Sequence, residues 1–248
     1  MLFFNAKEVH NADTPFHVDN CDIVTFQYCK NKIENTDFVL LKPHLTIVID
    51  LTQSKEKLWE GVNANSHRLI NKAKRENVCF HQDEHYDEFY KIYKSFLKNK
   101  GYATFHGYLG MFGIGAVTKK TMKDYGTLFT ASCNNEVLAG TLALESNTSI
   151  HAWIGATKRL TADREKDKLI SRANRFLLWN IMNYAKNKGI EEFDLGGIFT
   201  DEEVKKDPQK RGIREFKMQL GGKKVTRYQY QKIYSPTLKR IYRVFTST

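Results

Sequence analysis

Two short segments near the C-terminus contain residue types that could take part in a group-transfer reaction. The first, Phe193-Asp194-Leu195-Gly196-Gly197, places a carboxylate just before two glycines. A carboxylate at the end of a strand could serve as a general base or orient an acceptor, whereas aspartate before glycine also often caps a loop. The two glycines would let a ligand approach the backbone closely, or would only form a turn.

The second segment runs from Gly212 to Gly222 and indicates a short basic helix that ends at Gly221. Within it, Lys217 directly follows Phe216. A cation held beside a reacting carbonyl stabilises the negative charge that develops on the oxygen, so Lys217 is a candidate catalytic residue. A solvated helix lysine is the alternative, and Phe216 is interpreted as a packing residue that orients its neighbour.

Basic side chains form a third candidate group. Arg68, Lys72 and Arg75 recur at i, i+4 and i+7 on one face of an expected helix, and Arg159 and Arg164 lie in a polar loop before another helix. Such side chains could bind the phosphates of a nucleotide-linked or lipid-linked substrate, or of tRNA. A solvated helix face is the alternative interpretation.

Two histidines, His67 and His151, could act as a general base, although a lone histidine is more often structural. The chain also holds four cysteines that lie far apart in the sequence: Cys21, Cys29, Cys79 and Cys133. They form no C-x-x-C pair and have no histidine at metal-ligand spacing. We therefore expect reduced thiols and predict no metal site.

The composition is that of a globular protein, with 41% hydrophobic and 27% charged residues among 248. No apolar run approaches the roughly 20 residues that a membrane-spanning helix needs, and the N-terminus does not resemble a signal peptide. The net charge of +11 favours anionic partners, although a plain solvated surface would give the same figure. We expect a cytoplasmic protein, and peripheral contact with the inner face of the membrane stays open.

The hydrophobic pattern predicts alternating strands and helices along most of the chain. Extended segments are expected at 39–41 and 45–51, broken at Pro43, and further strands at 78–81, 127–133, 136–145, 149–156, 192–195 and 225–230. Helices are expected at about 54–76, with Ser54 as N-cap, at 86–99 and 169–187, and just before Gly221. Three antiparallel strands followed by helix, strand, helix and strand indicate an α+β fold with a mixed sheet.

Several of these segments resemble the FemAB-type acyltransferases of the GNAT superfamily. Residues 47–51 and 68–75 resemble the strand and basic helix that open such domains, and 138–140 and 153–156 resemble their central meander. Residues 174–189, 193–197 and the Phe216-Lys217 pair are similar to their C-terminal half, so the similarity extends over about residues 45–232. It implies a GNAT-like acyltransferase domain over 51–248. Because bridge-forming members carry two such domains, it also implies that 1–50 belongs to a reduced second GNAT-like half.

The resemblance implies transfer of an aminoacyl or acyl group onto an amine of a cell-envelope precursor, a peptidoglycan or polysaccharide intermediate. It implies a catalytic role for Lys217, and Asp194 is the second expected catalytic residue. The donor would be aminoacyl-tRNA or acyl-CoA, used as a co-substrate rather than a tightly bound cofactor. The remaining expected site residues are Arg68, Lys72, Phe216, Gly196 and Gly197 for the substrate, and Arg159 and Arg164 for the donor.

The loop at 157–168 lacks the glycine-rich R-x-x-G-x-G cradle that is typical of CoA-dependent GNAT enzymes. Its absence favours aminoacyl-tRNA as the donor. Two alternatives remain open. One is an acyl-CoA N-acyltransferase that acts on an amino sugar or small amine. The other is a non-catalytic RNA-binding protein, favoured by the charge and by the basic and aromatic run at 224–230. The oligomeric state is not predicted.

Overall fold

The computed structural model describes residues 5–34, 37–99, 117–158 and 163–240. The chain divides into two compact units. The larger comprises Thr46–Phe105 and Ala116–Lys224, and the smaller comprises Met1–Leu45, His106–Gly115 and Val225–Thr248. Two strands, β3 (Val39–Asp50) and β9 (Lys223–Ile233), pass from one unit into the other.

A mixed sheet forms the centre of the larger unit. Its strand order is β3, β8 (Glu192–Gly197), β7 (Ser149–Thr157), β6 (Glu136–Glu145), β5 (Thr127–Cys133) and β4 (Cys79–Gln82). Neighbouring strands are antiparallel except β7 and β8, which are parallel. The predicted meander and the α+β fold with a mixed sheet are therefore confirmed.

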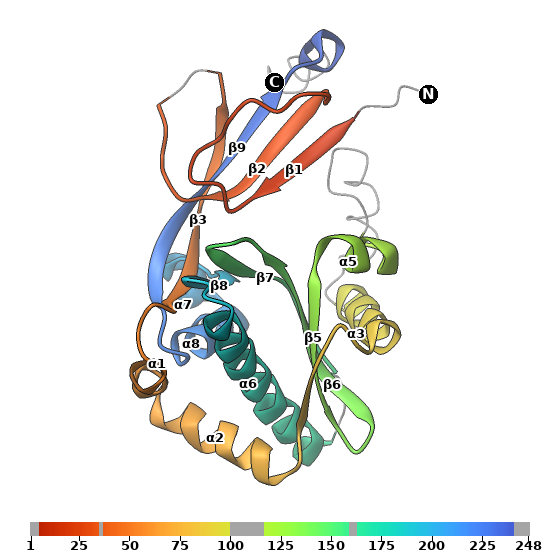
Figure 1. Cartoon of the computed structure of the whole chain (residues 1–248), viewed down its shortest axis with the longest axis vertical. Coiled ribbons are helices and arrows are strands. Elements are labelled where there is room, and N and C mark those ends of the chain that lie inside the picture. The colour runs from red at the N-terminus through yellow and green to blue at the C-terminus, as the bar shows by residue number, and fades with distance from the viewer. Residues whose placement is uncertain (1–4, 35–36, 100–116, 159–162, 241–248) are drawn as a thin grey trace. The chain divides into compact units, whose positions relative to one another are not determined.

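Helices cover both faces of this sheet (Figure 1). On one face α6 (Arg164–Asn187) packs on β5 and β6, with α2 (Ala64–Arg75) beside it. On the other face lie α3 (Tyr86–Asn99) and α5 (Lys119–Tyr125). Each face has its own apolar cluster, the larger one beneath α6. Three shorter helices complete the described part of this unit: α1 (Lys55–Gly61), α7 (Asp201–Lys206) and α8 (Pro208–Met218).

The helix predicted over 54–76 is in fact two helices, and the break has a local cause. Val62 is extended, and the Asn63 side chain accepts a hydrogen bond from Ser66 N, so that Asn63 caps a new helix. The Asn63 N–H donates to the carbonyl of Gln219 at the end of α8. The turn is therefore tied to α8. Ser54 is the N-cap of α1, as predicted.

Gly221 follows α8 and lies against Gly61 at the end of α1. Its φ is +92°, and a Cβ there would lie 2.7 Å from the carbonyl carbon and oxygen of Gly61. A side chain at 221 would therefore force α1 and the end of α8 apart. The glycine that was predicted to end the basic helix also permits this contact.

Two further boundaries differ from the prediction. The helix expected from 169 begins at Arg164, because the Asp163 side chain accepts hydrogen bonds from Glu165 N and Lys166 N. Its first turn is polar, so the apolar periodicity starts later than the helix. Strand β3 continues through Pro43 instead of breaking there, since the fixed φ of proline is compatible with an extended chain.

The smaller unit contains the strand order β1 (Ala6–His10), β2 (Ile23–Cys29), β9, β3. β1 and β2 are parallel, and β2 and β9 are antiparallel. Its core consists of Val24, Phe26, Cys29, Phe38 and Tyr230. None of the helices in the described ranges combines the length and the apolarity that a membrane-spanning segment needs.

Candidate active site

The end of β8 places Asp194 where two parallel strands separate. The ladder between β7 and β8 pairs Ser149 with Glu192 and ends at the pair His151 and Asp194. Beyond it, β7 continues against β6 and β8 continues against β3. At such a divergence, backbone N–H and C=O groups become available to a ligand.

Asp194 points away from α6. Its neighbours Phe193 and Leu195 belong to the core beneath that helix, and strand residues alternate between faces. Although Asp194 is only 3% exposed, its Oδ1 accepts hydrogen bonds from the Gly196 N–H at 2.7 Å and from the Thr46 hydroxyl. His151 Nδ1 lies 3.6 Å from the same oxygen.

These contacts decide the charge of Asp194. Burial alone would raise the pKa of this carboxyl. His151, the Thr46 hydroxyl and the Gly196 N–H act in the opposite direction, and the pKa is lowered on balance. A buried carboxylate with a lowered pKa stays ionised at neutral pH. It is therefore better suited to orient or attract a cationic group than to remove a proton from one.

A bulge in β8 sets the geometry around this carboxylate. Thr46 pairs with Gly197 and Val48 with Asp194, so β8 carries one more residue than β3 over this interval. Gly196 lies within it with φ +79°. A Cβ there would lie 3.2 Å from the Ala152 carbonyl oxygen and 3.4 Å from Lys217 Nζ. Glycine at 196 therefore leaves room for the lysine.

Lys217 extends from α8 to this bulge, where its Nζ donates to the Gly197 carbonyl at 2.9 Å. Burial lowers the pKa of Lys217 to about 8, and the Asp194 carboxylate opposes that shift. At pH 7 roughly a tenth of the lysines would be neutral. The structure thus brings Lys217, Asp194, Gly196 and Gly197 together.

Phe216 has a different environment from its neighbour. Its ring packs against the core beneath α6, and the Arg175 guanidinium carbon lies 4.8 Å from the ring centroid. Arg175 is buried and donates to Ser66 Oγ, Ser171 Oγ and Gln219 Oε1, and so joins α2, α6 and α8. Phe216 therefore packs in the core as expected, and its role in substrate binding stays a prediction.

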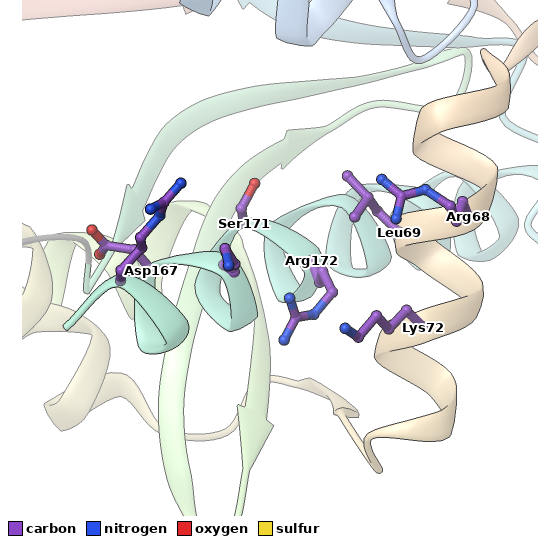
Figure 2. A pocket seen from close by; sticks show the side chains of 8 residues that line it. Arg68, Leu69, Lys72, Asp167, Ser171 and Arg172 are labelled. Atoms are coloured by element: carbon purple, nitrogen blue, oxygen red, sulfur yellow. The ribbon is translucent and has the colours of Figure 1, made fainter.

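A cationic pocket of about 490 Å³ lies between α2 and the start of α6 (Figure 2). It is lined by Arg68, Leu69, Lys72, Arg164, Asp167, Lys168, Ser171 and Arg172. Lys72 and Arg172 extend toward each other in Figure 2. Both contact Glu76: the Arg172 guanidinium donates to its two carboxylate oxygens at 2.6 and 2.9 Å, and Lys72 Nζ lies 3.8 Å away.

This pocket gathers three of the predicted basic residues, Arg68, Lys72 and Arg164. Arg159 lies outside the described residues. The pocket and the Lys217 cluster are connected through the protein interior. Ser171 lines the pocket and accepts a 2.8 Å hydrogen bond from Arg175, which in turn contacts α8 through Phe216 and Gln219.

From the sequence His151 is only a lone histidine, and Thr46 and Arg175 are not predicted as site residues. Arg175 interrupts the apolar stripe of α6 between Ala173 and Phe176, and a basic residue within such a stripe is a signal of a buried polar contact. His67, the other histidine considered, is structural: its Nε2 lies 2.6 Å from the Trp59 carbonyl oxygen and its ring stacks on Trp59.

Comparison with solved structures identifies the same fold elsewhere. The match with FemX covers 89% of this chain and 74% of the FemX chain, at 12% sequence identity and with a TM-score of 0.61. A second match is the C-terminal domain of a protein from Agrobacterium fabrum that is described as a lysylphosphatidylglycerol synthetase. It covers 90% of this chain and 71% of that domain's chain, at 14% identity and with a TM-score of 0.58. L-PGS from Bacillus licheniformis covers 88% and 71% at 15% identity with a TM-score of 0.54.

No curated protein matches the sequence. Residues 65–218, more than half of the chain, match the family described as "Acetyltransferase (GNAT) domain". This range contains α2 except its first residue, the meander, the cationic pocket, Asp194 and Lys217. The expected superfamily is confirmed, and the chain belongs to the GNAT acetyltransferase family.

Proposed function

We propose that this chain transfers an aminoacyl group from aminoacyl-tRNA onto an amine of a cell-envelope precursor. The observation that carries the proposal is the position of Lys217. Its amino group contacts the Gly197 carbonyl at the separation of β7 and β8, within the electrostatic reach of the buried Asp194 carboxylate. A cation and a fixed carboxylate on either side of an open strand end suit the chemistry of acyl transfer to an amine.

In the proposed reaction, the acceptor nitrogen forms a bond with the carbonyl carbon of the aminoacyl ester. The bond between that carbon and the ribose oxygen then breaks. The amine loses a proton, and the departing ribose oxygen gains one. Protonated Lys217 stabilises the oxyanion of the tetrahedral intermediate. An ammonium has three donors, and within the described residues the hydrogen bond to Gly197 uses one of them.

Asp194 serves the acceptor in this scheme. Its carboxylate stays ionised and attracts an incoming ammonium group, while His151 beside it can receive the proton that the amine must lose. Gly196 and Gly197 leave the backbone open to the acceptor. We assign Lys217 and Asp194 as the catalytic pair on these grounds.

The cationic pocket is proposed to bind phosphates of the donor. Five of its eight lining residues are lysine or arginine. Asp167 Oδ1 is buried and accepts no hydrogen bond from the described part of the chain, so it can accept one from a ligand hydroxyl. Because the preceding loop lacks a glycine-rich cradle, side-chain cations rather than backbone N–H groups would hold these phosphates.

Two of the similar structures support an aminoacyl donor and an envelope acceptor. The resemblance to FemAB-type enzymes implies bridge formation in peptidoglycan, and the name lysylphosphatidylglycerol synthetase describes a lysyl group on a lipid. We propose by analogy a phosphate-bearing acceptor and a location at the cytoplasmic face of the membrane. An acyl-CoA donor is the second candidate, favoured by the acetyltransferase description of the matched family.

Transfer assays with the purified chain separate the two donors. Radiolabelled aminoacyl-tRNAs and acetyl-CoA are supplied in turn, with lipid-linked peptidoglycan precursor or phosphatidylglycerol vesicles as acceptors. We expect label to move from aminoacyl-tRNA and not from acetyl-CoA. Transfer from acetyl-CoA alone would establish the second candidate. Salt-sensitive tRNA binding without any transfer would instead indicate an RNA-binding protein.

A further inference from the structure

The turn between β4 and α3 gathers two histidines and a glutamate. His81 lies near the end of β4, and Glu84 and His85 immediately precede α3. One potential ligand atom from each residue lies within 4.8 Å of the other two. Glu84 Oε2 is 3.4 Å from His81 Nδ1 and 3.8 Å from His85 Nε2. Imidazole nitrogens and a carboxylate oxygen are the ligands that zinc prefers beside thiolates.

A hydrogen bond orients His81 for such a role. Its Nε2 lies 2.7 Å from the Ser132 hydroxyl on β5. When Nε2 carries the proton and donates it to Ser132, Nδ1 presents a lone pair toward the Glu84 carboxylate. Glu84 Oε2 lies 3.4 Å from that nitrogen, so a cation placed between the two atoms would be bound by both. Metal-binding histidines commonly have their second ring nitrogen fixed in this way.

His85 adds a second and independent observation. Its Nε2 is buried and makes no hydrogen bond with the described residues. A buried ring nitrogen without a hydrogen bond is unfavourable. The nitrogen faces the same Glu84 oxygen as His81 does, and the two rings pack edge to face with centroids 4.7 Å apart.

The backbone of the turn is held in an uncommon conformation. Asp83 and His85 both have left-handed φ values, +55° and +63°. The Asp83 side chain fixes this conformation by accepting hydrogen bonds from Leu128 N and the Tyr86 hydroxyl. Strained backbone of this kind concentrates at functional sites, and here it directs three potential ligands to one point.

We propose that His81, Glu84 and His85 bind a zinc ion, with water as the fourth ligand. Bonds of about 2.05 Å in a tetrahedron separate ligand atoms by about 3.3 Å. The two separations from Glu84, 3.4 and 3.8 Å, already approach this value. The carboxylate is 62% exposed, so the ion and its water have access from solvent.

This site is separate from the proposed acyl-transfer centre. In the sheet β4 lies four strands from β8, which corresponds to about 19 Å at ~4.8 Å per strand. Bound zinc would therefore stabilise the turn that joins β4 to α3 rather than take part in the transfer. It would do so by binding the folded chain in preference to the unfolded one.

Calorimetric titration of the chelator-treated full chain with zinc chloride tests this proposal. We expect one zinc per chain and a thermal unfolding midpoint that rises with zinc concentration. His85→Ala and Glu84→Gln should each weaken binding by about tenfold or more, and Ser132→Ala by about tenfold. His17→Ala, which removes an exposed histidine of the smaller unit, should leave binding unchanged.

Three results would overturn the proposal: absence of zinc binding, binding that His85→Ala and Glu84→Gln leave intact, or equal binding of magnesium. Circular dichroism of each variant shows whether it is folded. Since Glu84 is largely exposed, its glutamine variant retains the fold and remains informative if the His85 variant does not. Acyl transfer by the Glu84 variant should equal that of the wild type, so failure here is distinct from failure of the proposed function.

Discussion

At the scale of single residues, the protonation of Lys217 is the feature with the clearest chemical consequence. Burial lowers its pKa to about 8, in spite of the opposing Asp194 carboxylate. The lysine therefore changes charge within a pH range that is accessible to kinetics. Its proposed role requires the charged form, whereas a general base would require the neutral form.

The pH profile of transfer distinguishes these roles. The value of kcat/KM should fall as the pH rises above about 8, because Lys217 loses its charge there. In Lys217→Arg this fall should be absent, since a guanidinium stays charged, even if the maximal rate is lower. A wild-type rate that rises through pH 8, together with a flat profile for the arginine variant, would assign Lys217 as a base instead.

Asp194 should contribute to stability in a pH-dependent way. Its pKa is lowered in the folded state through His151, Thr46 and Gly196, against the effect of burial. Its contribution is therefore present above the unfolded value of about 4 and is lost as the pH falls through the lower folded value. Asp194→Asn should reduce the free energy of unfolding by about 1–3 kcal/mol at pH 7.

Urea denaturation of both proteins between pH 3 and 7 measures this difference. The gap between wild type and Asp194→Asn should narrow as the pH falls below about 4, because the carboxyl is then protonated in the unfolded chain while it is still ionised in the folded one. A gap of constant size over the whole range would mean that shape, not charge, accounts for the effect of the substitution.

At the scale of elements, the bulge in β8 and the position of α8 form the site together. Gly196 in the bulge has φ +79° and leaves space for Lys217 Nζ. Gly196→Ala should lower the free energy of unfolding by about 1–3 kcal/mol, because its φ is strained for alanine and its Cβ would lie 3.2 Å from the Ala152 carbonyl oxygen, and should reduce transfer, because the bulge that contacts Lys217 would have to shift. Chemical denaturation and the transfer assay measure the two effects.

Gly212→Ala is the matched control for that substitution. Gly212 lies within α8, and a Cβ there would meet no atom within 4 Å. Alanine at this position should raise the free energy of unfolding by about 0.5–1 kcal/mol, because it is the better helix former, and leave transfer unchanged. Equal losses of activity from the two alanine variants would argue against a specific role for the bulge.

The element scale also shows what could be predicted from the sequence. Apolar periodicity located the meander and α3, because their buried faces determine their pattern. It could not locate the start of α6 or the break before α2, because capping by Asp163 and Asn63 decides those boundaries. Motif resemblance indicated Asp194 and Lys217 separately. The contacts of Asp194 with Thr46 and His151 join distant parts of the chain, and only the folded sheet brings them together.

At the scale of the whole molecule, the net charge is +11, and the pocket between α2 and α6 gathers five of the basic side chains. The smaller unit has its own apolar core, and its derivation from a second GNAT-like half stays a prediction. If the pocket binds tRNA phosphates, its cations should govern the affinity and its dependence on salt.

Filter binding of tRNA at several salt concentrations tests the role of the pocket. The double variant Arg68→Ala/Lys72→Ala should weaken binding and reduce the slope of log Kd against log salt by about 1 to 2. The double variant Lys55→Ala/Lys74→Ala removes the same charge from a different cavity and should have a smaller effect. Equal effects of the two double variants would mean that the pocket is not the binding site.

The most direct test of the account is the single-turnover rate constant of aminoacyl transfer, measured with the protein in excess over aminoacyl-tRNA. Lys217→Ala should reduce this rate constant about 100-fold or more, the usual consequence of removing a group that stabilises an oxyanion. Lys210→Ala, on the same helix and paired with Glu203, should leave it unchanged. Equal rate constants for wild type and Lys217→Ala, in an assay that detects transfer, would contradict the central role of Lys217.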